Sequence, residues 1–297
     1  MSRHPPGDIA AYNAATESMA RLLIVRQSPD DDPAATTLPW LDDLHVEVVT
    51  GAADALQRLA DKAFDALLLG PASSVEDDLA FLQQARALRP GIRAIFLAAA
   101  ATPAAVIKAM QAEVFAVFTR PFDPTQIANL VIKAADEDGA LEHGIRVLGA
   151  APHWVTLRVS AQLVTADRVV AFMDELHKQL FDDDEMDHLL LAFREILLNA
   201  VEHGAGLDAG KEVRVDAIRT RHALTFYVRD PGPGFAVGTQ DHSASDSDPL
   251  SHMQRRMQAG LRPGGYGMLL SRKLVDEVIY SQAGNEVLLV KHLDVPG

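Results

Sequence analysis

The sequence predicts two domains of different architecture, an α/β doubly wound parallel sheet followed by an α+β two-layer sandwich. The chain has 297 residues, which exceeds the usual size of a single domain. Between residues 21 and 136, short apolar runs alternate with helical segments, which is typical of parallel strands buried on both faces. After residue 153, apolar and polar residues alternate along the strands, which indicates a sheet with one solvated face.

The first predicted domain spans residues 21–136. Its expected strands are Leu22–Val25, Val46–Thr50, Ala66–Leu69, Ala94–Ala98 and Ala116–Thr119. Its expected helices are Ala52–Ala63, Asp77–Leu88, Pro103–Ala112 and Pro124–Ala135. The last helix has a clear start, because Asp123 is a favourable N-cap and Pro124 suits the first helical position. Residues 1–20 are expected to form a flexible tail, and residues 137–153 a linker.

The second predicted domain spans residues 154–297. Its expected strands are Trp154–Val159, Val213–Arg219, Ala223–Arg229, Glu277–Gln282 and Glu286–Leu293. Its expected helices are Ala166–Leu180, Glu185–Glu202 and Tyr266–Val275. The segment Thr239–Asp248 is rich in Ser and Asp, a composition typical of mobile chain.

Composition excludes several classes of function. The net charge is −14, and the acidity is spread over both halves, with 11 Lys and Arg against 19 Asp and Glu up to residue 140. A nucleic-acid module would concentrate basic residues on one face, so direct nucleic-acid binding is not expected. No apolar run approaches the ~20 residues of a membrane helix, and no secretory signal begins the chain. Cysteine is absent. A cytoplasmic protein is expected.

Three segments of the second domain carry candidate chemistry. In the predicted helix around Phe193–His203, the spacing by four places Glu195, Asn199 and His203 on one face, while Leu191, Leu198 and Val201 are expected to face the core. An amide oxygen can ligate Mg²⁺, and a carboxylate can accept a proton from a hydroxyl. Glu and Asn on a helix are nevertheless most often simple surface residues.

The other two segments are rich in glycine. Asp230, Gly232 and Gly234 follow a strand, where they allow a tight turn and a close approach to the backbone. The run Gly264–Met268 begins a predicted helix, where free backbone N–H groups favour phosphate. Taken singly, the Asp230 segment is an ordinary turn, and the Gly264–Met268 run is a flexible connection.

The order and spacing of the three segments resemble the N, G1 and G2 boxes of the GHKL superfamily of ATPases, which share the Bergerat ATP-binding fold. Within it, "LLLAFREILLNAVEHG" and "GGYGMLLSRKLVDEV" are most similar to the anti-sigma factor serine kinases of bacterial partner-switching systems. The resemblance covers residues 154–293. A histidine kinase fits less well, because its phosphoacceptor hairpin has no counterpart around His143.

The resemblance implies a role for each matching residue. Glu195 would be the catalytic base, Asn199 would bind Mg²⁺, and Asp230 would accept a hydrogen bond from the adenine amine. The remaining residues expected to contact ATP are His203, Gly232, Gly234, Gly264, Gly265, Gly267 and Met268. Residues 238–263 would form a lid. The family's last strand often begins with Gly-Thr, whereas this chain has Asn285 and Glu286 after Gly284, and a glutamate near phosphates would repel them.

Residues 21–136 resemble a flavodoxin-like response-regulator receiver, with Phe118–Asp123 similar to its closing signature. The acidic pair and the phosphoacceptor of receivers are replaced by Arg26, Gln27 and Gly70, and the later positions hold Ala98 and Arg120. Acidic clusters at 30–32 and 77–78 are not expected to replace them. The resemblance therefore implies a pseudo-receiver used for dimerisation or partner docking.

These resemblances imply an ATP- and Mg²⁺-dependent protein serine/threonine kinase. Its expected substrate is a STAS-domain anti-sigma factor antagonist, and a sigma factor is a further possible partner. A homodimer is expected. A non-catalytic module, in which ATP only sets the conformation that binds a partner, is the alternative.

Overall fold

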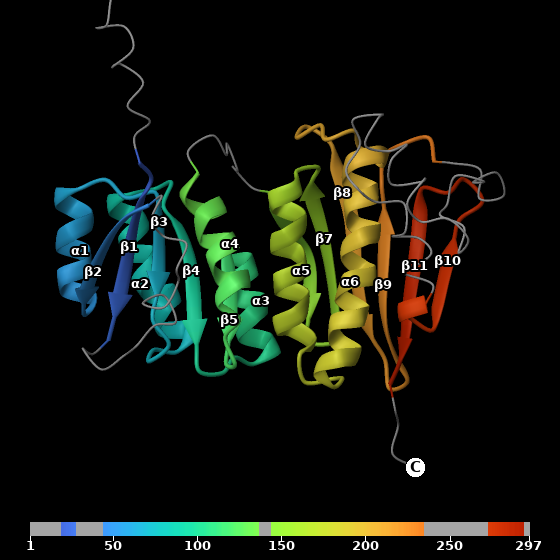
Figure 1. Cartoon of the computed structure of the whole chain (residues 1–297), viewed down its shortest axis with the longest axis horizontal. Helices are drawn as coiled ribbons and strands as arrows, with labels where there is room; N and C mark the ends of the chain where they lie inside the picture. Colours follow the sequence, from blue (N-terminus) through green and yellow to red (C-terminus); the bar gives the residue numbers. More distant parts are fainter. Residues whose placement is uncertain (1–18, 28–43, 137–143, 235–272, 294–297) are drawn as a thin grey trace, which may run out of the picture.

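The computed structural model describes residues 19–27, 44–136, 144–234 and 273–293. The first domain contains a five-stranded parallel sheet in the order β2-β1-β3-β4-β5. Its strands are β1 (Arg21–Arg26), β2 (His45–Thr50), β3 (Ala66–Leu69), β4 (Arg93–Ala98) and β5 (Ala116–Thr119). This order is that of flavodoxin-like folds. The predicted doubly wound sheet is confirmed (Figure 1).

Both faces of this sheet are buried, as the continuous apolar runs predict. Leu22 and Ile24 of β1 enter one apolar core, and Leu23 and Val25 enter the other. The helices that cover the sheet are α1 (Ala52–Asp61), α2 (Val75–Leu88), α3 (Pro103–Gln111) and α4 (Pro124–Ala135). The Asp123 side chain accepts hydrogen bonds from the backbone N–H groups of Thr125 and Gln126, at 2.8 and 3.2 Å, which confirms the predicted N-cap.

The second domain contains a six-stranded antiparallel sheet in the order β10-β11-β9-β8-β7-β6. Its strands are β6 (Ile145–Ala151), β7 (Trp154–Ser160), β8 (Glu212–Arg219), β9 (Ala223–Arg229), β10 (Glu277–Tyr280) and β11 (Glu286–His292). Strand β6 lies inside the segment that the sequence predicts as a linker. It pairs with β7, and its charged surroundings and Gly149 conceal the short alternating pattern.

Two helices, α5 (Leu163–His177) and α6 (Asp183–Asn199), cover one face of the second sheet (Figure 1). The Phe193 ring of α6 stacks on Phe226 of β9 with centroids 4.3 Å apart. Leu198 and Val201 are buried as predicted, but Leu191 is 41% exposed, so its predicted core position is wrong. The predicted two-layer sandwich, with helices on one face, is confirmed.

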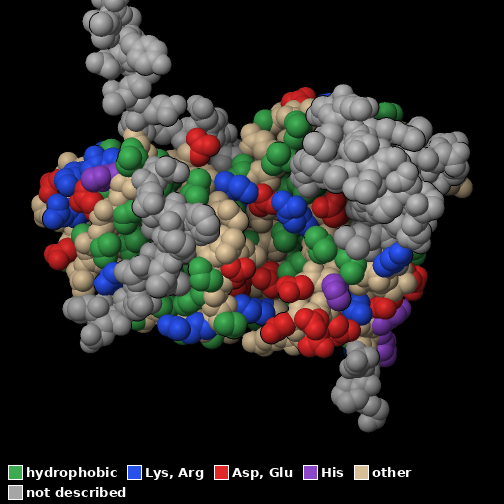
Figure 2. Space-filling view, viewed as in Figure 1, with side chains coloured by type: hydrophobic (Ala, Val, Ile, Leu, Met, Phe, Trp, Pro, Cys, Tyr) green, Lys and Arg blue, Asp and Glu red, His purple; other side chains and the backbone are tan. Residues whose placement is uncertain are grey.

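Acidic side chains gather over the start of α6 (Figure 2), whose first turn holds Asp183, Asp184 and Glu185. Negative charge is favourable at a helix N-terminus, where backbone N–H groups are unpaired. None of the helices in the described ranges is long and apolar enough to cross a membrane. The predicted N-terminal tail and the predicted helix Tyr266–Val275 both lie mostly outside the described residues.

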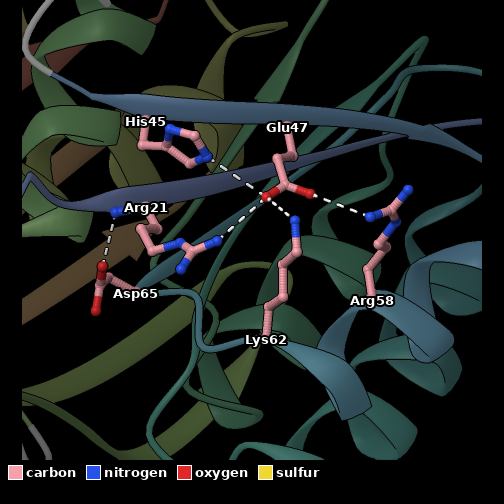
Figure 3. Close-up of polar contacts among 6 residues, drawn as sticks. All are labelled: Arg21, His45, Glu47, Arg58, Lys62 and Asp65. Atoms are coloured by element: carbon pink, nitrogen blue, oxygen red, sulfur yellow. Dashed lines mark hydrogen bonds and ion pairs between the residues drawn. The ribbon is translucent and has the colours of Figure 1, made fainter.

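Glu47 of the outer strand β2 lies at the centre of a cluster of basic side chains from β1, β2 and the end of α1 (Figure 3). Glu47 lies 2.8 Å from Lys62 Nζ, 3.2 Å from an Arg21 nitrogen, 3.4 Å from His45 Nε2 and 3.7 Å from an Arg58 nitrogen. The Lys62 hydrogen bond is the largest of the influences that hold the pKa of Glu47 below its ordinary value. The cluster ties β2 to the start of β1 and to the end of α1.

We expect Glu47→Gln to lower the free energy of unfolding by about 1 kcal/mol, because three permanent cations lose their shared counter-charge. Since the pKa of Glu47 is lower in the folded state, this stabilisation is present above the ordinary pKa of 4.5 and is lost as the pH falls below it. Urea unfolding at several pH values measures the effect. Glu76→Gln, which removes one exposed ion pair to Lys108, is the matched control. An equal loss in both variants would contradict the special role of the cluster.

Candidate functional site

The predicted catalytic helix is present as α6, and its last turns carry Glu195 and Asn199. Both side chains are half-buried, and their spacing by four places them on the same helical face. The α-helix ends at Asn199 and continues as a π-helical turn over Ala200–Gly204, in which Ala205 N–H donates to the Ala200 carbonyl at 2.8 Å. Such π-turns occur mostly as single turns and frequently at functional sites.

His203 lies within the π-turn. Its side chain is exposed, whereas those of Glu195 and Asn199 are half-buried. The common face predicted for the three residues stays a prediction. A contact between His203 and a nucleotide stays a prediction.

The structure brings the end of this helix against Asp230, which follows β9. A Cβ atom built on Gly204 would lie 2.2 Å from Asp230 Cγ and 2.4 Å from its Oδ1. Only a glycine allows the aspartate to lie this close to the backbone. Gly204 is thus a site residue to which the sequence analysis assigned no role, although it directly follows His203 in the quoted motif.

The glycines of the Asp230 turn are required by close contacts on both sides. Gly232 N–H donates to Asp230 Oδ1 at 2.8 Å, and a Cβ on Gly232 would lie 2.5 Å from the Gly204 carbonyl oxygen. Gly234 has a φ of +77°, and a Cβ there would lie 1.8 Å from the Ala283 oxygen. The groups that approach this turn closely are therefore backbone atoms of Gly204 and Ala283.

Asn285 holds the same turn in place. Its carbonyl oxygen accepts from Asp230 N–H at 3.1 Å, and its side-chain amide donates to the Gly232 oxygen at 3.3 Å. The neighbouring Glu286 is opposite Arg229 on β9, with an ion-pair distance of 3.5 Å. Buried Val228, next to Arg229, faces the helices, so Glu286 is on the open face of the sheet. It points away from the helical face that contains Asp230.

Desolvation by burial raises the pKa of Asp230 above its ordinary value, although the Gly232 N–H acts in the opposite direction. A half-buried carboxylate suits a ligand that donates a hydrogen bond from an exocyclic amine. Gly264, Gly265, Gly267, Met268 and the lid at 238–263 lie outside the described residues. The described part of the site is consistent with ATP and with Mg²⁺ held by the Asn199 amide oxygen and the phosphates.

The corresponding edge of the first domain carries no comparable carboxylate set in its described part. Arg26 ends β1, and Gly70 follows β3 directly. Asp77 bonds to Ser74 at the start of α2, whereas Asp78 is 2% exposed and accepts from Ser73 Oγ. Burial raises the pKa of Asp78 to about 7. An exposed capping residue and a buried acid do not form a pair that faces solvent, and residues 30–32 lie outside the described ranges.

Comparison with known proteins gives a family match for the second domain and similar solved structures for the first. Residues 159–291 match the family model described as a histidine kinase-like ATPase domain, so this part of the chain is a GHKL-like ATPase domain. The first domain is similar to a CheY-like receiver from Methanospirillum hungatei, at 21% identity over 40% of this chain and 96% of that one, with a TM-score of 0.35. No curated protein is significantly similar in sequence.

Two further solved structures are similar over the same part of the chain. A response regulator from Thermotoga maritima has 17% identity, covers 39% of this chain and 98% of its own, and has a TM-score of 0.36. A putative pilus assembly-related protein from Burkholderia pseudomallei has 25% identity, covers 39% and 90%, and has a TM-score of 0.33. The strand order of the first sheet is that of a receiver fold, and we refer to this part as the receiver-like domain.

We expect Gly204→Ala to lower ATP affinity roughly tenfold or more, because the added methyl group displaces the Asp230 side chain. Isothermal calorimetry measures the affinity, and thermal unfolding shows whether the variant is folded. Gly91→Ala is the matched control, since no atom lies within 4 Å of a Cβ at that position. Unchanged affinity in a folded Gly204→Ala protein would contradict the assignment of Asp230 to the nucleotide site.

We expect Asp230→Asn to weaken ATP binding roughly tenfold, because a neutral amide is a weaker acceptor than a carboxylate. In the wild type, affinity should fall as the pH drops through the raised pKa of Asp230, and the variant should lack this component. Asp208→Asn is the control, because Asp208 also accepts from a glycine N–H two residues later, at 2.9 Å. Calorimetry at a series of pH values from the ordinary pKa of 3.8 upward makes the comparison, and parallel profiles for wild type and Asp230→Asn would contradict the prediction.

Proposed function

We propose that the protein is an ATP- and Mg²⁺-dependent protein serine kinase of the anti-sigma factor type. The observation that carries the proposal is the contact of the α6 end with the Asp230 turn through Gly204. This contact puts the candidate adenine-binding residue beside the end of the helix that carries the candidate base and the candidate metal ligand. Glu286 pairs with Arg229 on the open face of the sheet, so its charge is not directed at phosphates bound on the helical face.

In the proposed reaction, Glu195 accepts the proton of a substrate serine hydroxyl. The serine oxygen forms a bond to the γ-phosphorus, the bond from that phosphorus to the β–γ bridging oxygen breaks, and ADP leaves. Asn199 would hold Mg²⁺, which supplies charge stabilisation at the phosphates. Asp230 would orient the base of ATP. Most of the catalytic effect in such transfers comes from positioning and electrostatics.

The proposed substrate is a STAS-domain anti-sigma factor antagonist, and a sigma factor is proposed as a second partner. The support is the similarity of the α6 motif to the serine kinases and the presence of Arg26 and Gly70, which are not carboxylates, at the ends of β1 and β3. We further propose that the protein acts as a homodimer in the cytoplasm, without binding membrane or nucleic acid directly.

The first test is ATP binding by calorimetry with and without Mg²⁺. We expect wild type to need Mg²⁺, and Asn199→Ala to lose roughly tenfold or more in affinity through loss of the metal ligand. Wild type that fails to bind ATP would contradict the proposal at its first step.

The second test is phosphoryl transfer from labelled ATP to the cognate STAS protein. We expect Glu195→Ala to lower the transfer rate roughly a hundredfold or more, with ATP affinity changed little, because the base acts in the chemical step. Glu185→Ala, at the opposite end of α6 and paired with Lys291, is the control. ATP binding without any transfer, with the partner still bound, would favour a non-catalytic binding module instead. Label on a histidine of this chain would indicate a histidine kinase.

A further inference from the structure

Helix α5 belongs structurally to both domains. It lies on the second sheet beside α6, and its other side packs against β5 and α3 of the receiver-like domain (Figure 1). One continuous cluster of buried apolar side chains joins the domains, and it includes Met110 and Val114 of the first and Ile145 and Phe172 of the second. The two domains therefore share a core in addition to a covalent connection.

Side chains of α5 pair with the backbone at the outer edge of β5, which is the last strand of its sheet. Glu175 accepts from Thr119 N–H at 2.8 Å and from Thr119 Oγ1 at 2.6 Å. Lys178 Nζ donates to the Thr119 carbonyl at 3.2 Å. An uncovered strand edge leaves backbone groups without partners, and here a helix supplies them.

Arg168, also on α5, hydrogen-bonds to the backbone just before the start of β5. Its Nε donates to the Phe115 carbonyl at 2.9 Å, another guanidinium nitrogen donates to the Val114 carbonyl at 3.3 Å, and the group lies 4.5 Å from the Phe115 ring centroid. Arg168 is 6% exposed and Glu175 is 8% exposed. Burial of ionisable groups is costly unless they are hydrogen-bonded, so this contact requires the fixed geometry of both domains.

The residue before Arg168 extends the connection to the candidate site. Asp167 accepts from Lys133 of α4, at 2.5 Å, through one carboxylate oxygen. Its other oxygen accepts from two Arg194 nitrogens of α6, at 3.1 and 2.9 Å. Arg194 directly precedes Glu195. A single carboxylate therefore joins the receiver-like domain to the turn of α6 that carries the candidate base.

We propose that Asp167 is a positioning residue, which, together with Lys133 and Arg194, holds α6 in place against the receiver-like domain. In this arrangement, Lys133 of the receiver-like domain supports the turn of α6 that carries Glu195 through Asp167. Loss of the carboxylate leaves Lys133 and Arg194 as neighbouring cations without their shared partner, and α6 loses one of its lateral attachments. The role in catalysis rests on the proposed kinase function, whereas the mechanical link is independent of it.

Amide hydrogen exchange on the full chain tests the link directly. In Asp167→Asn and in Lys133→Met, we expect exchange at residues 194–204 to rise roughly three- to tenfold, and the double variant to show no further rise. Lys108→Met is the control, because Lys108 forms an ion pair with Glu76 within the receiver-like domain. Exchange in α2 serves as the internal reference for global destabilisation.

The outcomes separate the parts of the proposal. A rise in Asp167→Asn alone would overturn the link between domains, because Asp167 would then act on Arg194 only. Equal rises in α2 and α6, or additive effects in the double variant, would overturn it as well. If the wild type transfers phosphate, kcat should fall roughly fivefold in Asp167→Asn and Lys133→Met with little change in the KM for ATP. An unchanged kcat despite faster exchange would overturn the positioning role, and failure of wild type to transfer phosphate would overturn only the proposed function.

Discussion

The candidate site depends on the absence of one side chain at Gly204. The helix that carries Glu195 and Asn199 can meet the Asp230 turn only if no atom projects from the helix end at that point. Gly204 is the last residue of the π-turn that follows α6. Asn285 then holds the far side of the same turn through two hydrogen bonds. The position of the Asp230 turn is therefore fixed by close backbone contacts on both sides.

Much of the fold could be predicted because its signals are local. The buried strands of the first domain are continuous apolar runs, and the start of α4 has an aspartate followed by proline. Strand β6 could not be predicted, because a bulge near Gly149 interrupts its alternation. The exposure of Leu191 follows from helix rotation, which is set by packing such as that of Phe193 on Phe226.

The site was predictable in part for the same reason. Glu195, Asn199 and Asp230 could be chosen from spacing and residue type, because a motif is a local pattern. The π-turn over Ala200–Gly204 could not be predicted, since a π-turn has no reliable sequence signal. The contacts of α5 were also hidden. Arg168 and Glu175 resemble ordinary solvated helix residues, and their partners are backbone atoms of β5, which are present in every sequence.

The pairing of α5 with the edge of β5 means that the sequence domains and the units of folding do not coincide. A fragment that ended before α5 would leave the outer edge of β5 open, together with apolar surface around Met110 and Val114. Such an edge is a template for pairing with another chain, and isolated receiver-like fragments would tend to aggregate. A fragment that began after the receiver-like domain would place the buried charges of Arg168 and Glu175 in water. Both halves are thus expected to need the full chain for their native packing.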